Sequence, residues 1–125
     1  MTETLWRYVI VGLLVVHGVG HTLGWWFLGH SWLLSDLVGG GALRVIGLVL
    51  WALVAIGYLG AAMGLWVYQG WWRPVAITMS AISLAGLLAF WDVWPPNKFP
   101  AFAVDIGILV ALIWAHWPSP DLVGA

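Results

Sequence analysis

Residues 45–72 read VIGLVLWALVAIGYLGAAMGLWVYQGWW, and none of these side chains carries a formal charge. Gln69 is the only amide in the run. A helix needs about 20 apolar residues to cross the roughly 30 Å hydrocarbon core of a bilayer. In lipid, backbone amides must be hydrogen-bonded within their own segment, so a helix is the spanning form that fits. This stretch therefore predicts a transmembrane helix.

The composition of the whole chain agrees with that prediction. Of its 125 residues, 63% are hydrophobic and 7% are charged, and the formal net charge is −1. Soluble domains have about a quarter of their residues charged, so lipid rather than water must surround most of this protein. The near-neutral charge gives no support for a nucleic-acid partner. The absence of cysteine excludes a disulfide, a thiolate metal site and dithiol redox chemistry.

Charged residues divide the chain into four apolar runs. We expect a single all-α domain, residues 1–125, folded as an antiparallel bundle of four transmembrane helices at about 5–28, 43–67, 73–92 and 100–117. An even number of spans places both termini on one side of the membrane. The positive-inside rule gives a tie, because two basic residues flank each side. We expect cytoplasmic termini in a bacterial inner membrane, since Arg73 lies in a short loop on the terminal side.

Tryptophan is unusually frequent, with 12 residues. Indole rings prefer the membrane interface, and most of these positions fall near the predicted helix ends. We therefore interpret the group as two interfacial belts. Those assigned to the side of the termini are Trp6, Trp66, Trp71, Trp72, Trp114 and Trp117, and those assigned to the other side are Trp25, Trp26, Trp32, Trp91 and Trp94. Trp51 lies deeper and is a candidate wall of a pocket.

Ionisable residues within the apolar runs are the strongest functional signal, because charge at mid-membrane is costly and usually faces the protein interior. His17 and His21 lie four apart and share one helical face. We expect four candidate acid–base residues, one on each helix, to lie at similar depth; these are His21, Arg44, Asp92 and Asp105. The fifth candidate, His17, lies one turn deeper, near the middle of the first helix. Helical periodicity predicts one inward face on the second helix and one on the fourth. The face of the second helix carries Arg44, Trp51, Tyr58 and Gln69. The face of the fourth helix carries Asp105, Leu109, Leu112 and His116. We expect Trp51, Tyr58 and Trp91 to contact a ligand.

Purely structural roles are the alternative for each of these residues. Asp105 would then pair with Arg44 or Lys98 and hold helices together. The histidines would bond a carbonyl or a serine. Hydroxyl groups of the third helix are expected to bond their own helix, namely Thr78, Ser80 and Ser83. Glycines four apart, Gly20 with Gly24 and Gly60 with Gly64, predict close helix packing.

Two kinds of chemistry suit the histidine pair. A neighbouring Asp105 would orient His21 for acid–base catalysis on a substrate that enters from lipid. Metal or haem ligation is the alternative, although His116 lies at the opposite end of the bundle and spacing alone is weak support. We expect no metal, haem or other cofactor.

The pentapeptide His17-Gly18-Val19-Gly20-His21, in the first of four short spans, resembles the His-Gly-x-x-His signature of small bacterial four-helix membrane proteins that are similar to the DoxX-like group. This resemblance implies the four-helix fold and a link to quinone-coupled redox systems. No cofactor motif accompanies it.

The sequence thus favours a small membrane enzyme or binding protein for a lipid-soluble molecule. Two alternatives remain open: a non-catalytic subunit of a larger membrane complex, and a haem-, pigment- or quinone-associated redox subunit. Homo-oligomerisation also remains open.

Overall fold

The computed structural model describes residues 2–30, 40–90 and 98–125, and all regular structure in this part of the chain is helical. The long helices are α1 (Thr2–His30), α2 (Gly40–Trp66) and α3 (Trp72–Ala89). A shorter helix, α4 (Lys98–Leu109), continues into a π-helical turn, η2 (Val110–Trp114), and a last turn, α5 (Pro120–Val123), follows.

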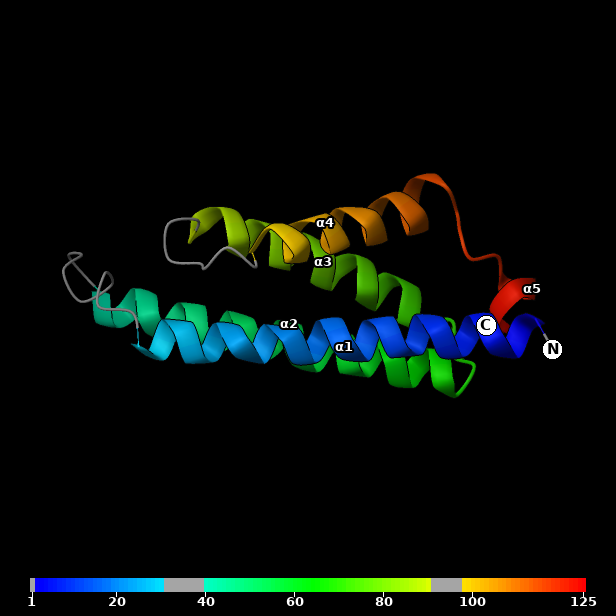
Figure 1. Cartoon of the computed structure of the whole chain (residues 1–125), viewed down its shortest axis with the longest axis horizontal. Coiled ribbons are helices and arrows are strands. Elements are labelled where there is room, and N and C mark those ends of the chain that lie inside the picture. Colours follow the sequence, from blue (N-terminus) through cyan, green and yellow to red (C-terminus); the bar gives the residue numbers. More distant parts are fainter. Residues whose placement is uncertain (1, 31–39, 91–97) are drawn as a thin grey trace.

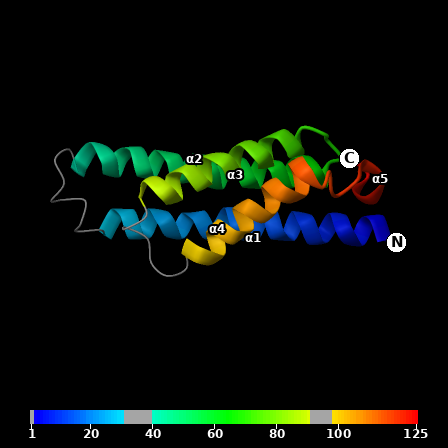
Figure 2. The same ribbon diagram turned by 90° about the horizontal axis from the view of Figure 1, so that it is seen from above.

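The helices form two layers (Figure 1). One layer is the antiparallel pair α1 and α2, which lie side by side over most of their length, and the other contains α3 and α4. Seen from above, α3 and α4 cross this pair obliquely (Figure 2). Both termini lie at the same end of the molecule, where α5 packs against the beginning of α1.

Three helices are long and apolar enough to cross a membrane, with candidate spans Glu3–Leu23, Val45–Trp66 and Trp72–Ala89 among the described residues. The integral membrane character predicted from composition is thereby supported. At about 1.5 Å per residue, the 12 residues of α4 cover only about 18 Å. The predicted fourth helix is thus shorter and less regular than expected.

The end of that fourth segment corrects the prediction of a helix to residue 117. In η2 the amide of Ala115 bonds the carbonyl of Val110, five residues earlier, and the chain then leaves the helix at His116, whose φ is 49°. Pro118 explains the break, because a proline disfavours helical geometry in the residue before it and lacks an amide proton. The inward face predicted for this helix, which begins at Asp105, therefore ends at Leu112, which is buried. His116 is exposed and does not continue that face.

The core lies between the two layers. Its largest buried side chains are Trp51, Trp72 and Tyr58, each at most 2% exposed. Trp72 was assigned to the interfacial belt, and that assignment is wrong because its indole packs inside the protein. The other described belt members are exposed by 39–81%; these are Trp6, Trp66, Trp71, Trp114 and Trp117.

Close approach of α1 and α2 occurs at Gly18 and not at the glycine pairs singled out above. A Cβ atom added at Gly18 would lie 2.9 Å from Cβ of Tyr58, whereas one added at Gly20 or Gly60 would meet nothing within 4 Å. Gly64 faces the ring of Trp71. The predictions for Gly20 and Gly60 were wrong, because the face of α1 that meets α2 is the one that carries Gly18; close packing at Gly24 stays a prediction.

Polar contacts hold the C-terminal segment at the end of the molecule where the termini lie. The guanidinium of Arg73 donates to the carbonyl of Pro118. Arg7 is 8% exposed and lies 4.1 Å from the ring centroid of Tyr68. Val123 of α5 is fully buried. The hydrogen bond of Arg73 and the packing of α5 on α1 hold the residues after η2 in place.

Candidate functional site

Asp105 is the centre of a buried polar network. Its side chain is fully buried, and its carboxylate receives three hydrogen bonds. His17 Nε2 and Tyr58 Oη contact Oδ1 at 2.8 Å and 2.5 Å, and Ser83 Oγ donates to Oδ2 at 2.5 Å. The four side chains come from α1, α2, α3 and α4, so the network joins all of the longer helices.

The two histidines meet at their outer ring nitrogens. Nε2 of His17 and Nε2 of His21 are 3.3 Å apart, and the rings lie edge to face with centroids at 4.8 Å. Ser83 Oγ is 3.4 Å from Nε2 of His21. Nε2 of His17 and Oδ1 of Asp105 share one proton in this bond. His17 is therefore the direct partner of Asp105, and His21 is connected to it through His17 and Ser83.

Aromatic rings hold the imidazoles in place. Tyr58 stacks on His21 with an interplanar angle of 5° and meets His17 edge to face. Trp51 also packs on His21, with ring centroids 5.0 Å apart and an interplanar angle of 38°. The absence of a side chain at Gly18 is what allows Tyr58 to approach α1 this closely. Both predicted ligand-contacting aromatics of α2 therefore lie in the site as walls of the histidine pair.

Two serines belong to this network although they were expected to bond their own helix. Ser80 Oγ is 2.7 Å from Tyr58 Oη, and Ser83 contacts Asp105 and His21. Only Thr78 behaves as predicted, donating to the carbonyl of Pro74. The sequence did contain a signal, because Ser80 and Ser83 lie three apart and so share one face of α3.

The remaining predicted residues lie outside this cluster or outside the described part of the chain. Asp92 and Trp91 belong to the segment 91–97, which the structure does not describe, and of Arg44 only the backbone, in α2, is described. The predicted pairing of Arg44 with Asp105 therefore stays a prediction. Gln69 follows the end of α2, is exposed, and donates to the carbonyl of Val67, so it does not extend the inward stripe of that helix.

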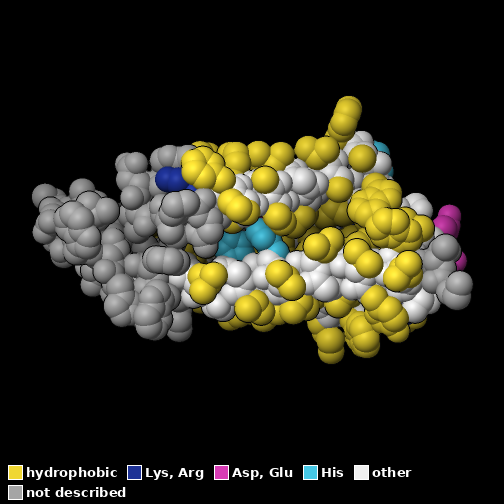
Figure 3. All heavy atoms as spheres, viewed as in Figure 1, with side chains coloured by type: hydrophobic (Ala, Val, Ile, Leu, Met, Phe, Trp, Pro, Cys, Tyr) yellow, Lys and Arg dark blue, Asp and Glu magenta, His cyan; other side chains and the backbone are white. Residues whose placement is uncertain are grey.

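A furrow between α1 and α4 leads from the molecular surface to the histidines. Histidine side chains are visible at its bottom (Figure 3), where His17 and His21 line a depression of about 290 Å³. Its other lining residues come from α1 and α4 and are apolar or glycine; they include Gly20, Leu23, Ala101 and Val104. Because this furrow lies along the helices and not at their ends, it opens sideways.

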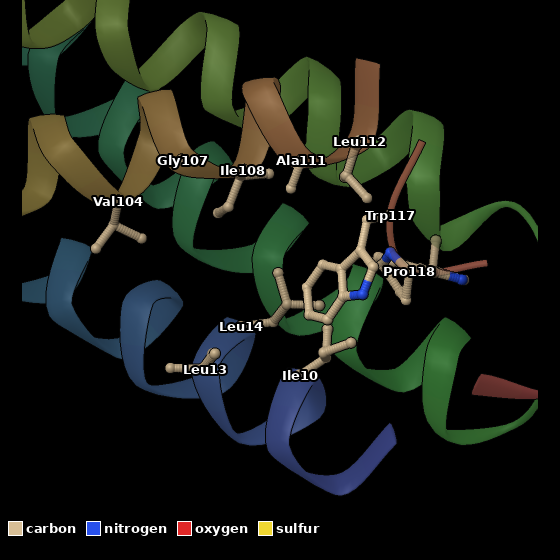
Figure 4. Close-up of a pocket in the computed structure, with 11 residues that line it drawn as sticks. Ile10, Leu13, Leu14, Val104, Gly107, Ile108, Ala111, Leu112, Trp117 and Pro118 are labelled. Atoms are coloured by element: carbon tan, nitrogen blue, oxygen red, sulfur yellow. The ribbon is translucent and has the colours of Figure 1, made fainter. Parts of the chain in front are cut away.

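A second, apolar depression of about 270 Å³ continues the furrow toward the end of the molecule that carries the termini. It shares Leu13 and Val104 with the first. Figure 4 shows residues of α1 along one side, those of α4 and η2 along the other, and the indole of Trp117 across one end. The complete furrow is thus polar at the histidines and apolar beyond them.

Comparison with protein-family models, curated proteins and solved structures finds no match for this chain. The resemblance of its first helix to the DoxX-like group remains a prediction.

Proposed function

We propose that this chain is a four-span integral membrane protein that binds a lipid-soluble molecule through the furrow between α1 and α4. In this topology α4 and η2 form the fourth span. Large apolar side chains are exposed on every described helix longer than one turn, including Val16, Ile56 and Leu88 at 60% or more. Such a surface is stable in hydrocarbon and is not expected in contact with water.

The shape of the furrow indicates the kind of molecule. A polar head group would lie at His17 and His21, and a hydrocarbon tail would lie along the apolar depression beside Ile10 and Leu112. Ligand sites are generally apolar with a few polar groups that fix orientation, which describes this furrow. A sideways opening would admit such a molecule directly from the bilayer.

His17 and Asp105 are the proposed acid–base pair. The observation that carries this role is the 2.8 Å bond between His17 Nε2 and Asp105 Oδ1 at the floor of an open furrow. A carboxylate that bonds an imidazole fixes its orientation. His21 lies beside the pair and would receive or donate the proton exchanged with the head group. The residues therefore suit proton transfer to or from an oxygen or nitrogen of the bound molecule.

Blocking the furrow tests the binding function. The full chain would be purified in mild detergent, and its co-purified lipophilic molecules would be extracted and quantified by mass spectrometry. Val104→Trp would fill the furrow, because Val104 lines both depressions. Val49→Trp is the matched control, since Val49 is 63% exposed and lines neither depression.

We expect wild type and Val49→Trp to retain a specific amphiphilic molecule that Val104→Trp loses by at least ten-fold. Equal retention by all three proteins, with only bulk membrane lipid in each extract, would contradict the proposal.

A further inference from the structure

We propose that His17, His21 and Asp105 together bind one divalent transition-metal ion. Each offers one ligand atom, and the three atoms all lie within 4.8 Å of one another. Two imidazole nitrogens and one carboxylate oxygen form a common ligand set for Zn²⁺ and for Fe²⁺. The spacing of the two histidines in the sequence does not by itself predict this site. The site forms because α4 brings Asp105 close to both histidines.

Two of the three distances between ligand atoms are close to those of tetrahedral coordination, and the third, between His21 and Asp105, is within 4.8 Å. With metal–ligand distances of about 2.0–2.1 Å, neighbouring ligand atoms of a tetrahedron are separated by about 3.3 Å. The two Nε2 atoms are 3.3 Å apart, so both can reach one ion without movement of their helices. Asp105 Oδ1 lies 2.8 Å from Nε2 of His17 and would have to separate from it by roughly 0.5 Å, which a side-chain rotation provides.

Proton accounting gives an independent argument. A neutral imidazole has either a proton or a lone pair at Nε2, and the proton of His17 is directed at Asp105. The remaining group near the two nitrogens is Ser83, which already donates to Oδ2. Two ring nitrogens that converge at 3.3 Å can share at most one proton, whereas a cation would bind a lone pair on each, with the proton between His17 and Asp105 transferred to Nδ1 of His17.

The surroundings of Asp105 resemble the outer shell of a metal site. Tyr58 and Ser83 donate to its two oxygen atoms and so hold the carboxylate in one orientation. Hydrogen bonds of this kind commonly position metal ligands and raise the affinity for the ion. Ser80 in turn bonds Tyr58 Oη.

Three protein ligands leave a coordination position for another molecule. Both histidines line the furrow, so that position would face it. Two neutral imidazoles and one carboxylate leave a divalent ion with a net charge of +1, which is costly in hydrocarbon. An anionic oxygen such as a phenolate or a carboxylate would neutralise it. The coordination of an anionic oxygen rests on the proposed function, and it makes the bound molecule a lipid-soluble weak acid. The ion-loaded protein would hold this molecule by coordination, and the ion-free protein would hold it by hydrogen bonds.

Cobalt binding tests the metal site. The purified full chain would be stripped with a chelator and titrated with Co²⁺, whose visible absorption bands are strong in tetrahedral sites. We expect wild type to bind one Co²⁺ per chain with such bands, and Zn²⁺ to displace it. His21→Ala should weaken binding at least ten-fold, whereas the control His116→Ala, which removes an exposed histidine outside the cluster, should bind as wild type does.

X-ray absorption of the zinc-loaded wild type gives a result that does not depend on the folding of any variant. Two imidazoles and oxygen ligands at about 2.0 Å are expected. A shell of oxygen alone, or Co²⁺ affinity that is unchanged in His21→Ala, would overturn the proposal.

The Val104→Trp variant separates this inference from the proposed function. It should lose the lipophilic molecule and still bind Co²⁺. If wild type retains the molecule but binds no Co²⁺, the metal site is wrong and the proposed function stands. If wild type binds Co²⁺ but retains no lipophilic molecule, the proposed function is wrong and the metal site stands.

Discussion

Asp105 is a buried carboxylate whose described partners are a histidine, a tyrosine and a serine. Hydrogen-bond donors of this kind can stabilise an anion without a formal cation, although each contributes only a modest net free energy. Removal of Asp105 would leave the hydroxyl of Ser83 buried without this acceptor. The identity of the replacement should therefore decide the outcome.

We predict that Asp105→Asn lowers the free energy of unfolding by less than about 1.5 kcal/mol, because the amide is nearly isosteric and still accepts a hydrogen bond. Asp105→Leu should cost more, about 3 kcal/mol, because it satisfies none of the donors. Retention of the lipophilic molecule should fall at least ten-fold in both variants. Denaturant unfolding in mixed micelles and mass spectrometry would measure these effects.

An ion pair with Arg44 predicts the opposite pattern. Asp105→Asn would then cost about 3–5 kcal/mol, because it would leave a buried charge without its partner. Adding Arg44→Gln would recover much of that loss. Such a recovery would show that Asp105 is a structural clamp.

The serines of α3 give a second prediction at this scale. Ser83→Ala should lower the free energy of unfolding by about 1–2 kcal/mol, because it removes a donor to the buried carboxylate. Thr78→Ala is the matched control on the same helix: Thr78 is exposed and bonds its own backbone, so a change within about 0.5 kcal/mol is expected. Equal effects of the two substitutions would argue against a role of Ser83 in the network.

The sequence identified His17, His21, Asp105, Tyr58 and Trp51 because residues of unusual polarity or size in an apolar helix are conspicuous. The prediction that Asp105 contacts His21 was wrong, because His17 is its direct partner. That pairing depends on the relative depth and rotation of α1 and α4, and the two candidates differ by a single helical turn. Partners of the serines were missed for the same reason.

At the scale of the helices, the packing of α1 on α2 depends on one small residue. Gly18 lies against the backbone carbonyl of Ala55 and the Cβ atom of Tyr58. A methyl group there would force the helices apart at the level of the histidines. The distance between His17 and the residues of α2 is thus set by Gly18.

We predict that Gly18→Ala lowers the free energy of unfolding by about 1–3 kcal/mol, as overpacking does elsewhere. Gly20→Ala, two residues along the same helix, should be neutral or stabilising by up to about 1 kcal/mol, because alanine has the higher helix propensity and nothing lies within 4 Å. Thermal unfolding of both variants in the same detergent would measure the difference. A greater loss for Gly20→Ala than for Gly18→Ala would refute this account of the packing.

Helix positions were easier to predict than helix ends. The apolar runs predicted four transmembrane helices; the structure contains three long ones with ends shifted by a few residues, and a fourth segment divided into α4 and η2. The π-helical turn η2 was not predicted, because its residues Val110–Trp114 are ordinary apolar side chains and the break depends on the proline that follows. Burial of Trp72 was likewise hidden, since an indole at a helix end suits either an interface or a core.

For the whole molecule, the number of spans is the main question. Three candidate spans would place the termini on opposite sides of a membrane if α4 stayed outside it. The four-span topology places them together, as does their position at one end of the fold (Figure 2).

We predict that reporter proteins fused at residue 3 and after Ala125 give the same compartment, and that this compartment is the cytoplasm of a bacterial cell. Compartment-specific reporters, such as a phosphatase and a fluorescent protein, would measure this. Signals from opposite compartments would exclude four spans, whereas a shared location outside the cytoplasm would reverse only the orientation.

The joining of four helices at one carboxylate has a consequence for biogenesis. A short segment that carries an aspartate is a poor substrate for the insertion machinery, since an aspartate at the centre of a span costs about 2.5–3.5 kcal/mol on insertion scales. The donors that relieve this cost belong to α1, α2 and α3, which are synthesised first. In the proposed four-span topology, integration of α4 should therefore follow the assembly of its predecessors in the bilayer, and correct insertion would depend on their polar groups reaching Asp105.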